Sequence, residues 1–208
     1  MRILAICAAL AATTLAAEAA TISGTGDAGT DPLFADATFV GFEGTATGSY
    51  SQLTFGDLTI DGIDGPFRIG STFAGNYNGR GTVYLDNNGG STSGLSFTFA
   101  TEVSAFAFNF GASDDSWTLT AFDALGNVIE TAAAPVVEAS NAGDYIGIAA
   151  AGIASFTLTT TVPATNDWVF VDDIVFNSGA SVAPVPLPAG LPLLLAGLGG
   201  LALTRRRG

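Results

Sequence analysis

The sequence Val103-Ser-Ala-Phe-Ala-Phe-Asn-Phe110 alternates large and small side chains. From position 106 phenylalanine occupies every second position, and alanine or asparagine stands between. Successive side chains of a β-strand point to opposite faces, so the phenylalanines share one face and the smaller residues share the other. A buried phenylalanine contributes about 1.5–3 kcal/mol to stability. We therefore predict a core strand over residues 103–110.

Short runs of the same kind fill the chain on both sides of this strand. Leu95, Phe97 and Phe99 alternate with serine and threonine, which predicts a strand with one buried face and one solvated face. Gly, Asn and Asp separate the runs, and no helical period is sustained between residues 21 and 180. The expected strands are 38–43, 50–55, 58–60, 82–85, 95–99, 103–110, 117–122, 128–131, 145–148, 153–161 and 168–176. About ten short strands pack naturally as an all-β sandwich.

The hairpin within this set has the clearest turn. Residues 117–122 and 128–131 flank Asp123-Ala-Leu-Gly-Asn127, in which Gly126 and Asn127 tolerate positive φ. The flanking runs are therefore expected to pair with each other in an antiparallel hairpin.

The amino-terminal end has the pattern of an export signal. Arg2 precedes an apolar run from Ile3 to Leu15, and the small-x-small sequence Ala17-Glu18-Ala19 follows. We predict a signal peptide over residues 1–19 that signal peptidase removes; an uncut membrane anchor is the alternative. Residues 20–36 are rich in Thr, Gly and Asp and are expected to form a flexible leader before a single domain at 37–178.

The carboxyl-terminal end combines prolines, an apolar segment and arginines. After a linker at 179–184, residues 185–208 contain a proline-containing motif and an apolar segment, and three arginines follow the apolar segment. An apolar helix of roughly 20 residues crosses a bilayer, and the positive-inside rule keeps the arginines cytoplasmic. The prolines before it favour an extended backbone outside the membrane. We therefore expect an inner-membrane intermediate with its body exported, or else an anchor that is retained uncut.

Composition excludes several kinds of chemistry. The chain has no His and no Lys, and its only cysteine, Cys7, lies in the predicted signal peptide. These absences remove Ser-His and Cys-His nucleophiles, lysine bases and histidine metal sites. Carboxylate chemistry remains, so a glycosidase using Asp114-Asp115 or Asp172-Asp173 is an alternative to the non-enzymatic protein that we favour.

The exported part is strongly acidic. Its eighteen carboxylates and only two arginines, Arg68 and Arg80, give it a charge of −16, which argues against nucleic acid as a partner.

Two aromatic residues are ligand candidates. The regularly spaced phenylalanines are expected to form the core, whereas Tyr77 and Trp117 lie outside that spacing. Tyr77 is in the loop Gly75-Asn-Tyr-Asn-Gly79, and Trp117 follows Asp114-Asp115. Either residue is suited to stacking on a sugar. The structural alternatives are a tyrosine that covers a sheet edge and a tryptophan that belongs to the core.

Three carboxylates are candidate ligands of a structural calcium ion. Glu43 lies at the end of the first expected strand of the domain, and Asp172 and Asp173 lie in the last. Jelly-roll topology commonly brings first and last strands together, and Ca²⁺ prefers six to eight oxygen ligands. By simple alternation Asp172 shares a face with four apolar residues of the last strand, Trp168, Phe170, Ile174 and Phe176. A carboxylate on such a face needs a cation or several donors. Solvation of Asp172, or backbone N–H donors, is the alternative.

The carboxyl-terminal motif resembles a known family. Val185-Pro-Leu-Pro-Ala189, the apolar segment and the arginine tail resemble the VPLPA variant of PEP-CTERM sorting signals of exopolysaccharide-producing Gram-negative bacteria. The resemblance implies processing by an exosortase, an integral-membrane cysteine transpeptidase, and transfer to the cell surface or the extracellular biofilm matrix. The matching substrate positions are Val185, Pro186, Leu187, Pro188 and Ala189 for recognition, with Arg205, Arg206 and Arg207 as the basic tail.

The body is similar to jelly-roll domains of PEP-CTERM proteins and to some carbohydrate-binding modules. The similar pieces are Phe42-Glu43, 106–111, 119–126, 145–148 and 171–176. In such modules a comparable Glu and Asp hold calcium, which implies this role for Glu43 with Asp172 or Asp173. We therefore expect an exported, non-enzymatic surface or matrix protein that has extracellular polysaccharide as a partner. A dedicated carbohydrate-binding module is the first alternative, and a carboxylate glycosidase is the second.

Overall fold

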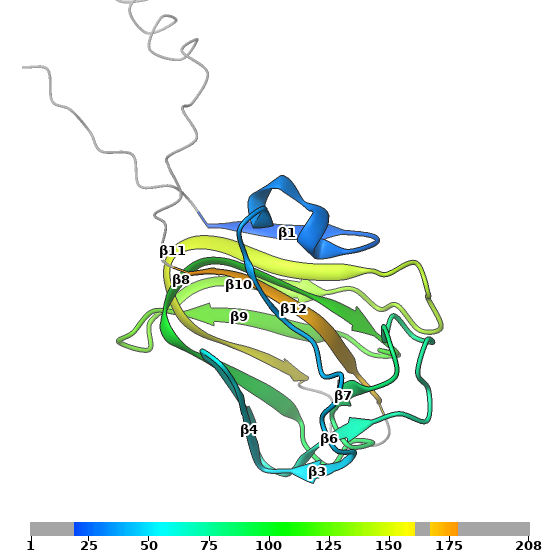
Figure 1. Ribbon diagram of the computed structural model, residues 1–208. Coiled ribbons are helices and arrows are strands. Elements are labelled where there is room, and N and C mark those ends of the chain that lie inside the picture. The colour runs from blue at the N-terminus through cyan, green and yellow to red at the C-terminus, as the bar shows by residue number, and fades with distance from the viewer. Residues whose placement is uncertain (1–18, 161–166, 179–208) are drawn as a thin grey trace, which may run out of the picture. The chain divides into compact units, whose positions relative to one another are not determined.

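The computed structural model describes residues 19–160 and 167–178, which form a sheet of twelve antiparallel strands and two short 3₁₀ turns (Figure 1). The all-β prediction is therefore confirmed. Among the described residues no helix has the length and apolarity needed to span a bilayer. The elements are β1 (Ala20–Gly24), η1 (Ala28–Thr30), η2 (Pro32–Phe34), β2 (Thr38–Val40), β3 (Gly48–Tyr50), β4 (Gln52–Phe55), β5 (Leu58–Gly62), β6 (Phe67–Gly70), β7 (Tyr84–Asp86), β8 (Gly94–Gly111), β9 (Trp117–Phe122), β10 (Val128–Ala134), β11 (Tyr145–Thr160) and β12 (Phe170–Ser178).

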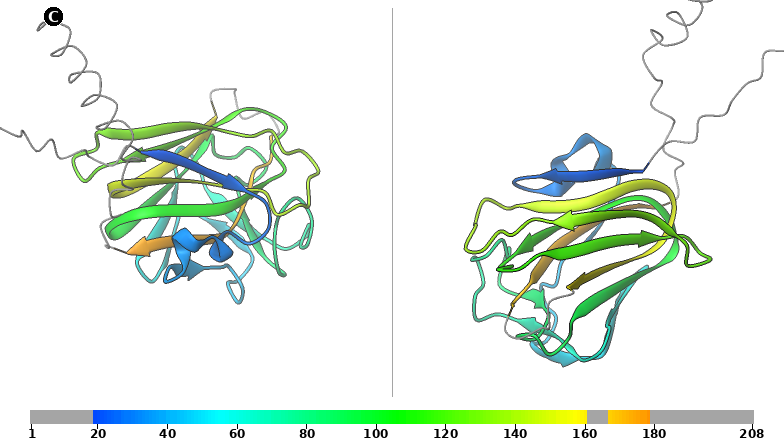
Figure 2. Two further views of the ribbon diagram at one scale, coloured as in Figure 1. Left: turned by 90° about the horizontal axis from the view of Figure 1, so that it is seen from above. Right: turned by 180° about the vertical axis from the view of Figure 1, so that it is seen from behind.

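Two long strands, β8 and β11, connect the halves of the fold. They pair with each other along most of their length, and the register shifts between Ala149 and Ser155, next to Gly152 with φ 73°. The first half of β8 also pairs with β5, and its second half pairs with β12. The start of β11 also pairs with β1, and its end pairs with β9. One hydrogen-bonded sheet thereby supplies both layers of a β-sandwich (Figures 1 and 2).

Ring distances show that β8 bends back over itself. Phe97 and Phe108 are eleven positions apart, yet their ring centroids are 6.2 Å apart and nearly parallel. A straight strand would separate them by about 36 Å at 3.3 Å per residue. Phe156 of β11 lies between the two layers, 4.3 Å from Phe97 and 3.9 Å from Phe106. The phenylalanines predicted to be core residues are fully buried in this cluster.

The segment expected to be a flexible leader is part of the fold. β1 lies beside β11 and pairs with it (Figure 2). Ala28 and Phe34 of the 3₁₀ turns pack against Ala105, Ala107 and Val175. Ala105 and Ala107, which alternate with the phenylalanines of β8, form an apolar patch on its outer face. Residues 20–36 are held in place because they bury this patch. The side chains of Asp27 and Asp31 cap the two turns by accepting N–H groups of Gly29 and Leu33. The prediction for residues 20–36 was therefore wrong.

The predicted hairpin is confirmed as β9–β10. The Asp123 carboxylate accepts hydrogen bonds from the backbone N–H groups of Leu125 and Asn127, and Gly126 has φ 80°. The expected strands 95–99 and 103–110 are one continuous strand, β8. The expected signal peptide apart from Ala19, the linker 179–184 and the sorting segment 185–208 lie outside the described residues and stay predictions.

Candidate functional site

Trp117 is a core residue. Its side chain is 1% exposed, and its Nε1–H donates to Asp167 Oδ2 over 2.6 Å. The alternation of β9 turns Trp117, Leu119 and Ala121 inward, as expected for the first residue of a half-buried strand. A buried indole cannot stack on a sugar, so the structure removes Trp117 from the ligand candidates.

Tyr77 lies at a cavity of about 520 Å³ that has an aromatic wall. We call this cavity the aromatic pocket. Its volume falls in the range typical of small-ligand sites. Apart from two alanines, 112 and 139, its lining residues are Phe73, Tyr77, Asp114, Glu138, Trp168 and Phe170. The sequence analysis thus named Tyr77 as a ligand candidate and Asp114 for the glycosidase alternative, but it missed Trp168, which it assigned to the last strand.

The aromatic side chains of the pocket support one another. Phe73 meets Tyr77 and Trp168 edge to face, with ring centroids 5.8 Å and 5.4 Å away. Phe170 is stacked at 4.2 Å on the buried ring of Tyr84. These contacts hold the wall in a fixed arrangement, because edge-to-face and offset-stacked pairs are the favoured aromatic geometries.

Trp168 is further fixed by two neighbours. The guanidinium carbon of Arg68 lies 5.1 Å from the centre of the Trp168 ring, and Arg68 is itself held by Asp86 over 2.9 Å. A Cβ at Gly89 would lie 2.8 Å from Trp168 Nε1, so this position requires glycine or a shift of the indole. The indole is therefore packed against its neighbours while remaining half-exposed.

The backbone around the aromatic pocket is strained. Tyr77, Ala112 and Glu138 line it with φ values of 54°, 63° and 40°. Positive φ is uncommon for residues other than glycine, and such strain persists where the surroundings enforce it, often at ligand sites. Three of the six such residues in the described part of the chain line this one cavity.

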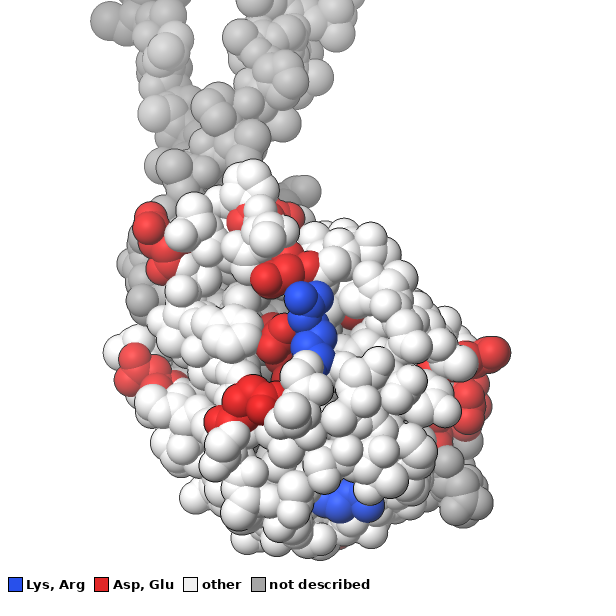
Figure 3. All heavy atoms as spheres, turned by 45° about the vertical axis from the view of Figure 1, so that its right-hand side comes forward, with Lys and Arg blue, Asp and Glu red and all other residues white. Residues whose placement is uncertain are grey.

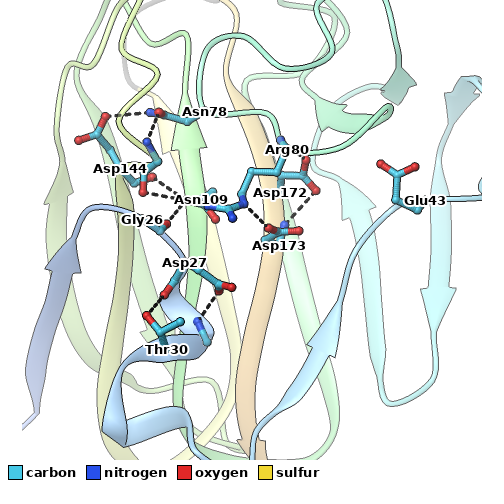
Figure 4. Close-up of polar contacts among 12 residues, drawn as sticks. Gly26, Asp27, Thr30, Glu43, Asn78, Arg80, Asn109, Asp144, Asp172 and Asp173 are labelled. Atoms are coloured by element: carbon cyan, nitrogen blue, oxygen red, sulfur yellow. Dashed lines mark hydrogen bonds and ion pairs between the residues drawn. The ribbon is translucent and has the colours of Figure 1, made fainter.

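Asn78 enforces the conformation of the Tyr77 loop. Its buried Nδ2 donates to the Phe110 carbonyl over 2.8 Å and to Asp144 Oδ2 over 2.9 Å, and its Oδ1 accepts the N–H of Gly143. The Tyr77 carbonyl lies so close to Gly111 that no Cβ fits there. The loop is thus clamped onto the end of β8 (Figure 4).

The pocket also contains two exposed carboxylates. Asp114 comes from the β8–β9 loop and Glu138 from the β10–β11 loop. The N–H of Asp114 donates to Asp167, and the N–H of Glu138 donates to the Ser113 carbonyl, so both backbones are fixed. Neither carboxylate has a hydrogen bond or ion pair with the residues that the structure describes.

Glu43 lies beside the β6–β7 loop. Its carboxylate accepts hydrogen bonds from the side chain and N–H of Thr82, both over 2.6 Å, and from the N–H of Val83. The Thr82 hydroxyl, followed by the Thr82 amide, lowers the pKa of Glu43. As expected, the strand before Glu43 is adjacent to the last strand, because β2 pairs with β12.

Asp172 does not share a face with Ile174 and Phe176, contrary to the prediction. Asp173 has φ 46° and forms a bulge, where the register with β8 shifts between Asp172 and Val175. One extra residue reverses the alternation, so Ile174 points into the core while Asp172 lies opposite Asn109 on the outer face.

Arg80 contacts both aspartates of the bulge (Figure 4). Its N–H donates to Asp172 Oδ2 over 2.8 Å, and its Nε is 2.8 Å from Asp173 Oδ2. The other Asp172 oxygen accepts the N–H of Asp173. Burial first, and the neighbouring negative charge of Asp173 second, raise the pKa of Asp172 to about 7. Figure 3 shows one basic side chain with several acidic side chains beside it on the same face of the molecule.

Asn109 leaves one polar atom unsatisfied beside this network. Its Nδ2 donates to the carbonyls of Gly26 and Gly143, whereas its buried Oδ1 has no hydrogen-bond donor among the described residues. The described residues contain no group of three or more acidic, His or Cys side chains arranged to hold a metal. The three carboxylates predicted to bind calcium, Glu43, Asp172 and Asp173, lie near one end of β12, and each already accepts a hydrogen bond or ion pair from the protein.

Comparison with known proteins gives only loose structural likenesses. No family model matches the sequence, and no curated protein is similar enough to count as a relative. The K2 cleaved adhesin domain of Lys-gingipain is 14% identical with a TM-score of 0.46, over 70% of this chain and 99% of that one. A DUF4465 family protein from Bacteroides ovatus is 12% identical (TM-score 0.37; 77% and 99% covered), and a family 29 carbohydrate-binding module is 12% identical (TM-score 0.29; 72% and 99% covered). Likenesses this distant say nothing about the ligand.

Proposed function

We propose that the chain is an exported, non-enzymatic surface or matrix protein whose β domain binds extracellular polysaccharide in the aromatic pocket. The observation that carries this proposal is a cavity walled by Tyr77, Trp168 and Phe73 and bordered by strained backbone. Sugar rings have apolar C–H faces that pack on aromatic rings, while polar groups at the border fix their orientation. A preformed wall also lowers the ordering cost of binding.

Calorimetric titration of the full chain with soluble polysaccharides tests this proposal. Saturable binding is expected, together with a loss of at least about tenfold in affinity for Trp168→Ala, as for a central aromatic anchor. Tyr50→Ala is the matched control, because Tyr50 is a half-buried tyrosine on β3 that does not line the pocket. Equal affinity in the Trp168→Ala variant and the parent would refute the pocket as the binding site.

Export and sorting form a separate part of the proposal. The apolar run after Arg2, the motif Val185–Ala189 and the arginine tail support signal-peptidase cleavage followed by exosortase processing. Mass spectrometry of the protein isolated from the cell surface tests it. A mature chain that lacks both ends is expected, whereas a carboxyl terminus still carrying Arg205–Gly208 would contradict processing.

We also propose that a calcium ion binds near Asp172. The chemistry of the donor set supports it: Asp172 is 2% exposed with a pKa raised to about 7, and the neighbouring Asn109 Oδ1 has no donor in the described part of the chain. Oxygen atoms of this kind are calcium ligands. Asp173 and Glu43 are further candidates, and Arg80 is the internal cation that calcium would have to displace. A melting temperature that EGTA leaves unchanged would refute this part.

The glycosidase alternative receives a different residue assignment. Asp172 is buried and Asp173 is paired with Arg80, so neither is available to a sugar. Asp114 and Glu138 line the pocket, and these are the residues that a carboxylate mechanism would need. Turnover of chromogenic glycosides that Asp114→Asn or Glu138→Gln abolishes would be required to establish it.

A further inference from the structure

We infer that the aromatic pocket selects a polysaccharide that carries protonated amino groups. This inference rests on the proposed function and adds the charge of the ligand. Its basis is the combination, in one cavity, of half-exposed aromatic rings with the carboxylates of Asp114 and Glu138. An ammonium group is stabilised both by carboxylates and by the faces of aromatic rings, whereas a neutral sugar uses only the rings.

The charge of the domain argues against an anionic polysaccharide. The described residues contain eighteen carboxylates and two arginines. Both arginines are engaged, Arg68 with Asp86 and Arg80 with Asp173, each within 2.9 Å. No cation of the described part is therefore left to meet a uronate or sulfate group. Approach of an anionic polymer is opposed by the field of the whole domain, and approach of a cationic polymer is favoured.

One wall residue of the pocket, Trp168, already has a cation beside its ring. The guanidinium of Arg68 lies 5.1 Å from the centre of the Trp168 ring, within the distance at which a cation and an aromatic face attract each other. The planes of the Tyr77 and Phe73 rings, which both line the pocket, cross at 82°, so the edge of one ring meets the face of the other. An ammonium group near these rings would be attracted in the same way as the arginine.

The two carboxylates are positioned by contacts between loops. Ser113, next to Asp114, accepts the N–H of Glu138 at its carbonyl over 3.0 Å, and its hydroxyl donates to the Pro135 carbonyl. Asp167, next to Trp168, accepts the N–H groups of Asp114 and Asp115. The loop that carries Asp114 is therefore tied both to the Glu138 loop and to the Trp168 segment. Because the backbone under both carboxylates is already fixed, less order has to be imposed on them when a cation binds.

The test compares two ligands of equal length, a glucosamine tetramer and its N-acetylated form, by calorimetry on the full chain. At low salt and a pH where the amines are protonated, we expect the free-amine tetramer to bind roughly tenfold more tightly. In the double variant Asp114→Asn/Glu138→Gln the preference should disappear while the acetylated tetramer binds as before. The matched control is Asp57→Asn/Glu102→Gln, which removes two exposed carboxylates outside the pocket and should keep the preference.

Each outcome has a distinct meaning. Equal affinity of the parent chain for the two tetramers would overturn the amine inference and leave polysaccharide binding intact. A preference that survives in Asp114→Asn/Glu138→Gln, or that the control variant also loses, would assign it to the general acidic surface and would overturn the inference too. Failure of either tetramer and of every soluble polysaccharide to bind would refute the proposed function itself. Melting curves confirm that each variant is folded.

Discussion

The inner face of β8 and β11 and the outer side of the sheet, with its aromatic pocket, both carry aromatic residues, but in different settings. On the inner face Phe97, Phe106 and Phe156 stack with their rings within about 4.3 Å of a neighbour, and all are fully buried. On the outer side Trp168, just before β12, and Tyr77, in the β6–β7 loop, are half-exposed, next to carboxylates and residues with positive φ. The abundance of phenylalanine therefore indicates the core. The aromatic pocket is distinguished instead by residues with positive φ and by carboxylates at its border.

This difference predicts that the two faces respond oppositely to mutation. Substitutions on the inner face should lower stability, because they leave cavities in a packed core. Substitutions in the aromatic pocket should lower affinity with little effect on folding, because the pocket side chains remain partly in water.

Phe156→Ala should produce the greatest loss of stability. The ring of Phe156 lies between both halves of β8, and its removal leaves a cavity that costs about 3–5 kcal/mol. Urea denaturation measures the free energy of unfolding. Phe39→Ala is the control, since Phe39 is 56% exposed, and it should change stability by less than about 1 kcal/mol. Similar losses in the two variants would mean that the inner face is not the core.

Trp168→Ala should reverse this pattern. We expect a loss of affinity of about tenfold or more and a change in melting temperature of only a few degrees. The reason is that Trp168 gives a half-exposed ring to the pocket and none to the central phenylalanine cluster. Titration and melting of the same preparation measure both quantities. A large fall in stability with unchanged affinity would show that Trp168 is structural.

Asn78→Ala should have a moderate effect on both quantities. The variant loses the donors to Phe110 and Asp144 and leaves buried partners unsatisfied, which costs about 1–2 kcal/mol. Release of the Tyr77 loop should also weaken binding severalfold. Asn76→Ala is the control in the same loop, because Asn76 is exposed and, among the described residues, its side chain bonds only to the nearby Ala74 carbonyl. Identical behaviour of the two variants would contradict a clamp.

Asp172 should give a smaller, pH-dependent effect. Its folded pKa of about 7 is above the usual 3.8, so between about pH 4 and pH 7 the folded chain holds a proton that the unfolded chain releases. Stability from this group is therefore lost as the pH rises through this window and is regained on acidification, by about 1.4 kcal/mol per pKa unit at most.

Urea midpoints measured from pH 7.5 to 5.5 check this expectation. The parent chain should gain stability on acidification, and Asp172→Asn should show a flatter dependence. Saturating calcium should also flatten it, because a cation stabilises the ionised carboxylate. A parent chain that loses stability over this interval would contradict the burial of an uncompensated charge at Asp172.

The sequence predicted the inner face better than the outer one, for physical reasons. Alternation over 103–110 depends on local sequence alone, so the core strand and the β9–β10 turn were predictable. The bulge at Asp173 was not, because it arises from pairing with β8 and reverses every side chain beyond it. The aromatic pocket joins residues from 73 to 170, and only Tyr77 lay in a locally unusual sequence.

The amino-terminal segment shows a different limit. Its Thr, Gly and Asp content suggested a loose leader, yet the same aspartates cap two turns, and Ile22 contributes to the outer cluster. Polar composition therefore did not distinguish capping residues from a disordered segment. The segment is ordered because it packs on the alanines of β8, which lie about eighty residues further along the chain. A local sequence pattern does not contain this contact.

Tryptophan fluorescence during a titration with the glucosamine tetramer tests the outer-face site most directly. The chain has two tryptophans, of which Trp117 is buried against Asp167 and Trp168 is half-exposed in the pocket. A saturable change in emission is expected for the parent chain and for Tyr50→Ala, and it should disappear in Trp168→Phe. A flat titration of the parent chain, or an equal response in Trp168→Phe, would contradict ligand binding in the aromatic pocket.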